Sequence, residues 1–378
     1  MTILALLLAC TGEPGDTGLL DTCSQTSGTI CLYAGTGDAG YDPDEKHRLE
    51  TWLYFPMDIE VREGKPTIIL DWNNNSVRQV TPSETVVLAV GTGYAGDGPP
   101  DYSDNDPGGA PGTSTAMNHP TDAIWQADGE LLIAAWHNHK LRRWNPDTGL
   151  VHILGGGVTG FAGDGGPVVD ALFSQPHSVV AAEDGSIYLT DMRNGRVRVV
   201  APDLTISTLG GDGTQGFAGD GGPVSGAVFN FPTGATPRPG AGLALDGDTL
   251  YVSDSLNHRV RAVNLATGMI DTVVGTGIAG SSGDGGPAVD AQLNSPIDIE
   301  IGGGKLYIAD TDNSRIRVVD LASGTISTLV GTGESSWSGD DGPAVDAALN
   351  FPHGICLVED GRLFIADTYN HMIRVVYP

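Results

Sequence analysis

The chain is poor in basic residues, in cysteine and in aromatic side chains. Its 378 residues include 19 Lys and Arg against 47 Asp and Glu, which gives a formal net charge of −28. A surface with that charge repels phosphate backbones and anionic lipid headgroups, so nucleic acid is not expected as a partner. After the first ten residues, no apolar run is long enough to span a bilayer.

Glycine and proline, by contrast, are abundant. The chain has 55 Gly and 23 Pro, while apolar residues still make up 40% of it. So many turn residues are not compatible with a helical protein, and so many apolar residues are not compatible with disorder. The composition therefore predicts a folded β protein with frequent turns.

A repeat of 56 to 64 residues runs through the chain, and each copy begins at a proline. The unit is clearest over 296–333, where four short β-branched runs are separated by Gly, Asn and Asp turns, the pattern of a four-stranded antiparallel meander. Six such units predict an all-β, six-bladed β-propeller of four-stranded antiparallel blades. The six prolines are Pro56, Pro120, Pro176, Pro232, Pro296 and Pro352.

The two ends of the chain are predicted to meet in one blade. The last unit, 352–378, has only three candidate strands, and 29–37 reads TICLYAGTG, which matches the outer strands TISTLVGTG and MIDTVVGTG of other units. The N-terminal strand should therefore complete the last blade and cover two edges that would otherwise be exposed. The predicted propeller covers 29–378.

The repeats resemble the NHL repeat, whose letters stand almost literally at 257–259, 370–372 and 138–140. This resemblance implies a six-bladed propeller in which the loops before the first strand and after the second strand of each blade share one face. It says little about function, because one fold serves binders, scaffolds and enzymes.

The first ten residues, MTILALLLAC, resemble the end of a bacterial lipoprotein signal peptide, which implies cleavage before Cys10 and lipidation of its thiol. Residues 11–28 are rich in Gly, Thr, Ser and Asp and are predicted to be a flexible linker. Cys23 and Cys31 are close enough in sequence to form a disulfide in an oxidising compartment, while Cys356 lies in an apolar run and is predicted to be a buried thiol.

Two polar patterns recur in the units. The first is Asp-x-x-Asn-x-x-x-Arg between the second and third strands, as at Asp310, Asn313 and Arg317, and it is expected to be structural. The second is the loop motif GDGGP or GDDGP, whose aspartates are expected to accept hydrogen bonds from loop amides, with a calcium site as the alternative. These aspartates are Asp164, Asp220, Asp284 and Asp340.

Differences between the units point to function. Two inner strands begin with Pro-His, at His177 and His353, and resemble the strands of the peptidyl-amidoglycolate lyases, propellers in which three His hold a zinc ion. The resemblance implies that these two His ligate a metal with Asp58, Asp122 or Asp298 nearby. Only two of the three His are present, so a structural or solvated His pair is the preferred interpretation and a metal site is the alternative.

Aromatic residues and two insertions mark one face for ligand binding. Trp72 and Trp136 stand at equivalent turns, and His137 and His139 follow the second of them. Such rings can stack on a sugar or anchor a peptide. The insertions lie at 98–118 and 235–241, and the second of them includes Arg238.

The sequence thus favours a monomeric, extracytoplasmic binding or scaffold module of the bacterial cell envelope, either lipid-anchored or secreted. It would bind a protein, peptide or glycan on the loop-bearing face and would need no cofactor. The alternative is a metal-dependent enzyme, a lyase or lactonase, with zinc or calcium at the channel mouth. RNA binding would require a basic face, which this acidic chain does not offer.

Overall fold

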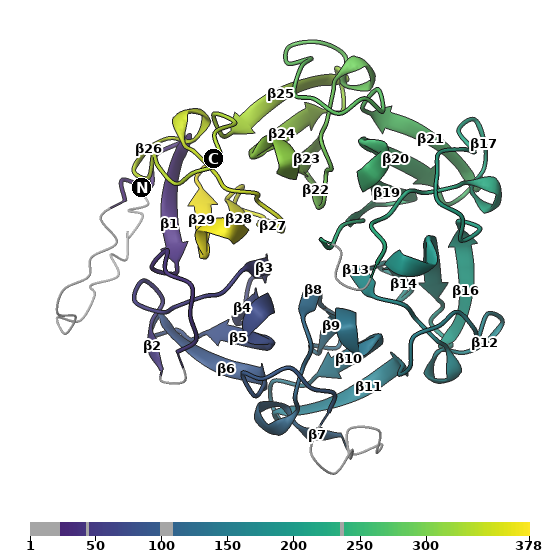
Figure 1. The fold of residues 1–378 in the computed structure, drawn as a ribbon, viewed down its shortest axis with the longest axis horizontal. Coiled ribbons are helices and arrows are strands. Elements are labelled where there is room, and N and C mark those ends of the chain that lie inside the picture. The colour runs from purple at the N-terminus through teal and green to yellow at the C-terminus, as the bar shows by residue number, and fades with distance from the viewer. Residues whose placement is uncertain (1–22, 43–44, 99–108, 235–237) are drawn as a thin grey trace, which may run out of the picture.

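The structure, a computed structural model, describes residues 23–42, 45–98, 109–234 and 238–378. Six antiparallel sheets stand around a central axis, as Figure 1 shows, and the first strand of each predicted unit faces that axis. The predicted six-bladed propeller is therefore confirmed. Among the described residues, no helix is long and apolar enough to cross a membrane.

Each blade is a meander that runs from the axis outward. Blades 1 to 3 comprise β3(Pro56–Glu60), β4(Thr67–Asp71), β5(Ser76–Val80) and β6(Thr85–Gly91); β8(Pro120–Trp125), β9(Leu131–Ala135), β10(Lys140–Trp144) and β11(Leu150–Gly156); and β13(Pro176–Ala181), β14(Ile187–Asp191), β15(Arg196–Val200) and β16(Thr205–Gly210). Blades 4 to 6 comprise β18(Leu243–Asp246), β19(Thr249–Asp254), β20(Arg259–Asn264) and β21(Met269–Val274); β22(Ile299–Gly302), β23(Lys305–Asp310), β24(Arg315–Asp320) and β25(Thr325–Val330); and β27(Ile355–Leu357), β28(Leu363–Asp367), β29(Met372–Val376) and β1(Thr29–Ala34).

Five sheets have one strand more than the four predicted. The extra strand has two residues, and in three blades it is the Gly-Pro pair of the repeated loop, which pairs with the outer strand. It covers the outer edge of the sheet, and where it contains a proline, that residue offers no N–H for further pairing. These strands are β2(Lys46–His47), β7(Ala110–Pro111), β12(Gly166–Pro167), β17(Gly222–Pro223) and β26(Gly342–Pro343).

The N-terminal strand closes the ring, as predicted. β1 lies between β29 and β26, and Cys31 is paired with Val375 of the last strand of the chain. In Figure 1 the N-terminal strand (purple) and the C-terminal strands (yellow) share one sheet. The closure buries Ile30 and Cys31 completely or nearly so.

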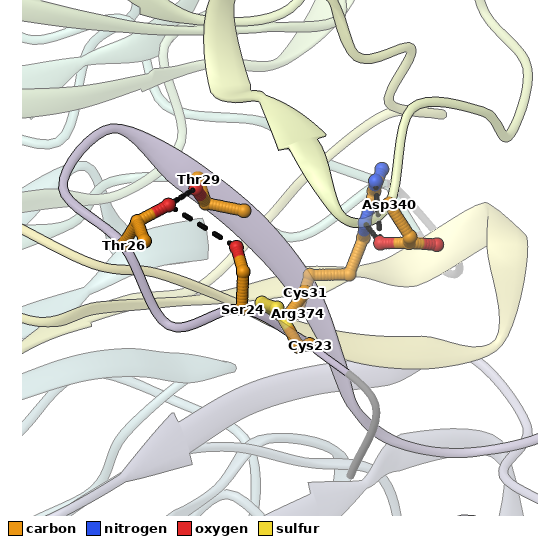
Figure 2. The surroundings of a disulfide bond; sticks show 7 residues. All are labelled: Cys23, Ser24, Thr26, Thr29, Cys31, Asp340 and Arg374. Atoms are coloured by element: carbon orange, nitrogen blue, oxygen red, sulfur yellow. Dashed lines mark hydrogen bonds and ion pairs between the residues drawn. A yellow bond between two sulfur atoms is a disulfide. The ribbon is translucent and has the colours of Figure 1, made fainter.

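A disulfide between Cys23 and Cys31, whose Cα atoms are 5.9 Å apart, fastens the segment before β1 to that strand. Figure 2 shows this segment folded back along β1, with hydroxyl contacts from Ser24 to Thr26 and from Thr26 to Thr29. Cys356 is a buried free thiol, as predicted. The lipidation predicted at Cys10 lies outside the described residues.

The hydrophobic core is divided among the interfaces between blades. One cluster, for example, joins Leu70 and Val77 of blade 1 to Leu131 and Ile133 of blade 2. Burial of one such side chain stabilises the fold by roughly 1.5–3 kcal/mol. The central channel is therefore lined by the side chains of the inner strands.

The two repeated polar patterns form one network, and this corrects the expectation that the loop aspartates mainly accept amide hydrogen bonds. In blade 5 the guanidinium of Arg317 is fully buried, donates to the loop carboxylate of Asp284 at 2.6 Å, and lies 3.3 Å from Asp310. The same buried arginine is present in the five other blades, at Arg78, Arg142, Arg198, Arg261 and Arg374. Because an arginine already neutralises each loop aspartate, the arrangement is structural and does not favour calcium there.

Candidate ligand-binding face and axial channel

The start of each inner strand and the end of the second strand meet at one end of the blade. Pro56 pairs with Asp71 in blade 1, and Pro120 pairs with Ala135 in blade 2. Residues just before the anchor prolines and just after the second strands are therefore brought together around one mouth of the channel.

One aromatic cluster at this mouth joins blades 6 and 1. The ring of Phe55 lies 4.7 Å from Tyr369 and 5.0 Å from Tyr54, and Tyr369 lies 5.1 Å from Phe351. Tyr369 is 39% exposed, so its ring is available to a ligand. This cluster was not predicted from the sequence, although Phe55 and Phe351, each directly before an anchor proline, were a usable signal.

A second cluster joins blades 1 and 2. His119 packs 4.2 Å from Trp72, its Nδ1 lies 2.8 Å from Nδ1 of His137, and His137 stacks on Trp136 at 3.9 Å. Trp72, His119 and His137 are half-buried, whereas Trp136 is completely buried. The expectation that Trp136 contacts a ligand is therefore corrected: its ring supports His137 from below.

His119 was not singled out in the sequence, and it is the hub of this cluster. Burial, assisted by the neighbouring His137, lowers the pKa of His119 to about 4. Its imidazole is therefore neutral near pH 7. Its Nδ1 lies 2.7 Å from Oδ1 of Asn118 and its Nε2 lies 3.4 Å from Oδ1 of Asn73, so both ring nitrogens have partners within the protein.

His139 was predicted to bind a ligand, but its contacts are structural. It occupies the left-handed turn position with φ 55°, and its Nδ1 accepts the backbone N–H of Gln175 in the next blade at 3.0 Å. His258 and His371 accept the amides of Ser295 and Phe55 in the same way. The histidine of the repeat thus joins adjacent blades and is structural.

Arg238, from the second insertion, reaches across two blades. Its guanidinium lies 4.8 Å from the ring of Phe351 in blade 6 and pairs with Asp312 in blade 5. Arg238 therefore lies beside the aromatic cluster of blades 6 and 1, where a partly exposed cation is available to a ligand.

The axial channel contains both predicted metal-site histidines. His177 and His353 are buried and line a cavity of about 10 Å³, together with Asp58, Asp122 and Asp298. The structure thus brings these five residues together. The other inner strands place no histidine at the equivalent position, so a three-histidine zinc site is not formed.

The channel carboxyls are crowded. Burial, with Asp122 nearby, raises the pKa of Asp298 to about 8, and burial raises the pKa of Asp122 to about 6. Burial also raises the pKa of Asp58 well above its usual range, and Asp122 and Asp298 add to the effect. Like charges in a poorly solvated space disfavour ionisation.

A wider cleft of about 620 Å³ lies at the opposite end of the axis, between blades 6 and 1. It is lined by Glu60 and Glu300, each two residues beyond a channel aspartate, and by Cys356. Burial raises the pKa of Glu60 to about 7 and, together with Asp298 and Glu60, raises that of Glu300 well above its usual range. Acidic groups therefore continue from the cavity to this cleft.

The last blade matches a known repeat family. The model of the NHL repeat matches residues 349–376. The chain is 26% identical to NHL repeat-containing protein 2 of Gallus gallus over 86% of its own length and 46% of that protein. It is 27% identical to the chloroplastic protein SUPPRESSOR OF QUENCHING 1 of Arabidopsis thaliana over 69% of its length and 24% of that protein. The chain thus spans less than half the length of these curated relatives.

Solved structures share the fold at low sequence identity. A Bacteroides thetaiotaomicron protein of unknown function superposes with a TM-score of 0.65 at 14% identity, covering 92% of this chain and 75% of that one. An auxiliary nutrient binding protein of Bacteroides ovatus gives a TM-score of 0.61 at 14% identity, covering 92% and 76%. The last blade matches the NHL repeat, relatives of the chain include an NHL repeat-containing protein, and the chain is a six-bladed β-propeller.

Proposed function

We propose that this propeller is a binding module that captures a protein, peptide or glycan at the channel mouth of its loop-bearing face. The observation that carries the proposal is the pair of aromatic clusters beside this mouth, one around Phe55 and Tyr369 and one around Trp72 and His119. Aromatic rings supply large contact area at small cost in conformational entropy, which is why they dominate binding sites.

The chemistry of the mouth favours a ligand that is apolar or aromatic on one side and hydrogen-bonding on the other. Neutral His119 offers an apolar ring surface, and Arg238 offers a cation that Asp312 holds in place. A carboxylate on the ligand would replace Asp312 on the guanidinium and form a charge-assisted hydrogen bond.

The proposal includes an extracytoplasmic location. A lipid anchor at Cys10 would hold the propeller on the outside of a bacterial membrane, where envelope proteins and glycans are the available ligands. Labelling with a fatty-acid analogue, with Cys10→Ser as the control, tests the anchor separately from binding.

Binding to arrays of glycans, peptides and envelope proteins tests the site. We expect Tyr369→Ala and Trp72→Ala each to weaken binding about thirtyfold or more, since hot-spot aromatics contribute ~2 kcal/mol or more. Tyr94→Ala is the matched control, because Tyr94 is 79% exposed in an interblade loop outside both clusters. Equal losses in all three variants would refute the proposed site.

A metal-dependent lyase or lactonase is the second candidate, and the observation in its favour is that His177 and His353 share one cavity with three carboxyls. The size of the cavity, about 10 Å³, is close to that of one water molecule, so a substrate would have to bind above it at the mouth. Hydrolysis or elimination activity lost in His177→Ala and His353→Ala, with rim variants unaffected, would establish this function over the first.

A further inference from the structure

A row of aromatic rings at the channel mouth ends at a guanidinium. The ring of Phe55 lies 4.7 Å from Tyr369, Tyr369 lies 5.1 Å from Phe351, and the guanidinium of Arg238 lies 4.8 Å from the ring of Phe351. Tyr369 and Arg238 are exposed, and the two phenylalanines are half-buried. The row therefore presents an apolar surface with one positively charged end.

The charged end is held by an ion pair that the repeat does not require. Arg238 belongs to the second insertion, which precedes β18, and it pairs with Asp312 of blade 5. Both side chains are partly exposed, and ion pairs of this kind contribute little to folding stability. The other blades have no acidic residue at the position of Asp312, where they carry Asn73, His137, Arg193, Leu256 and Tyr369.

The guanidinium also lies close to the channel. Burial lowers the pKa of His353 to about 3, and the positive charge of Arg238 contributes to that shift. His353 directly follows the anchor proline of blade 6. A ligand on Arg238 would therefore lie at the rim of the channel and beside the aromatic row.

The two phenylalanines of the row have an unfavourable backbone conformation. Phe55 and Phe351 have φ values of 52° and 48°, in the left-handed region that Gly and Asn adopt most easily. The conformation recurs before other anchor prolines, but the residues there are His119, Gln175 and Ser295. The fold therefore requires the turn and does not require a phenylalanine, whose ring adds contact area at the mouth.

We propose, building on the binding function proposed for this mouth, that the row binds the carboxyl-terminal end of a peptide whose last side chain is aromatic or large and apolar. The terminal carboxylate accepts charge-assisted hydrogen bonds from Arg238, and the last side chain packs on Tyr369 and Phe351. In the free protein the carboxylate of Asp312 occupies the place of the ligand on the guanidinium. Asp312 is therefore an internal competitor.

The apolar character of the row favours a peptide over a glycan. The side chains of Phe55 and Phe351 have no polar atom, so sugar hydroxyl groups laid on them would lose hydrogen bonds to water without replacing them. An aromatic side chain gains ring contacts there instead. The net charge of −28 also disfavours a ligand with many carboxylates, whereas a single carboxylate can pair with Arg238.

Binding of two hexapeptides that end in Phe, one with a free carboxylate and one amidated, tests the proposal. We expect the full-length protein to bind the free form about tenfold more tightly, because hydrogen bonds between charged groups are the strong ones. In Arg238→Gln the two peptides should bind equally. Arg259→Gln is the matched control and should keep the preference, since Arg259 stacks on Phe217 at 4.2 Å in an interblade loop outside the row.

Two further variants separate binding from folding. Asp312→Asn should bind the free peptide about two- to fivefold more tightly and the amidated peptide unchanged, because it removes the competing carboxylate. Phe351→Asn should weaken both peptides about tenfold. Its Tm should stay within about 2 °C of the unmodified protein, because Asn relieves the left-handed backbone conformation while packing is lost.

The proposal is overturned if neither peptide binds at about 1 mM, if both bind equally, if Arg238→Gln keeps the difference, or if Asp312→Asn weakens the free peptide. Tighter binding of an oligosaccharide with one uronic acid would also overturn it. The function of the mouth is tested separately by its array ligands. If these lose affinity in Tyr369→Ala while both peptides bind equally, the mouth binds a ligand of another class; if they do not, the function proposed for the mouth itself fails.

Discussion

Removal of the Arg317 guanidinium is the most direct test of the polar network that holds each blade. This side chain is fully buried and bonds to Asp284 at 2.6 Å, to the carbonyl oxygen of Gln292 at 3.2 Å and to Asp310 at 3.3 Å. Arg317→Ala leaves two carboxylates without their cation and opens a cavity. Breaking a buried ion pair in this way costs roughly 3–5 kcal/mol.

This cost can be converted into a melting temperature. The unfolding entropy is about 2.1 cal/mol/K per residue, so a propeller of roughly 350 residues loses about 1.4 °C for each kcal/mol, if it unfolds as one unit. We therefore expect Arg317→Ala to lower the Tm by roughly 4–7 °C, measured by calorimetry or circular dichroism.

A neighbouring arginine provides the control. Arg315 lies two residues earlier on β24, is only half-buried, and donates an exposed hydrogen bond to the carbonyl oxygen of Thr332. Arg315→Ala should therefore change the Tm by less than about 1 °C, as surface substitutions usually do. If the two variants melt together, the buried network does not stabilise the blade and its recurrence must be explained by function.

Three further predictions concern the mouth, the closure and a loop. Burial and His137 lower the pKa of His119 to about 4, below the value of about 6.5 expected in the unfolded chain. The stability gained from the neutral imidazole is therefore present above pH 6.5 and is lost as the pH falls toward 4. Titration of the ring signals of His119 by NMR should show the low pKa, and a pKa near 6.5 would contradict the described packing. Loss of the disulfide in Cys23→Ser should destabilise the segment before β1 by roughly 2–3 kcal/mol, the loop-closure entropy for a sequence separation of eight residues. Faster hydrogen exchange confined to β1 and its partner strands would show this loss of stability. Unchanged exchange would exclude a role of the disulfide in closure. Asp341 has φ 64°, whereas the equivalent residue in three other blades is a Gly with φ 74° to 82°. Asp341→Gly should therefore raise the free energy of unfolding by about 0.5–1 kcal/mol, measured with denaturant. A lower free energy of unfolding would show that the Asp341 side chain stabilises the loop by more than the left-handed backbone conformation costs.

The fold was accessible from the sequence because a propeller is a local, repeated structure. The anchor prolines, the β-branched runs and the Asp-x-x-Asn turns each specify one meander, and six copies leave little freedom in how the meanders are assembled. The match of 29–37 to the outer strands was enough to predict closure, because an unpaired strand at the end of a ring has only one free edge to join.

The candidate site depends on contacts between blades, and a repeat analysis that compares equivalent positions does not see them. His119 of blade 2 and Trp72 of blade 1 are 47 residues apart, and Phe55 and Tyr369 come from opposite ends of the chain. Trp136 and Trp72 occupy equivalent positions, yet one is buried beneath His137 and the other is only half-buried.

By itself, therefore, the sequence determined the number of blades, their strands and turns, and how the ring closes, because these rest on local patterns and on pairing along strands. Only the tertiary structure decided which carboxylates have an arginine partner and which face the axis without one. The loop aspartates and the inner-strand aspartates look alike in the sequence, but Asp284 meets Arg317 while Asp298 faces other acids. Their charge, pKa and chemistry follow from those neighbours, which the closed ring brings together.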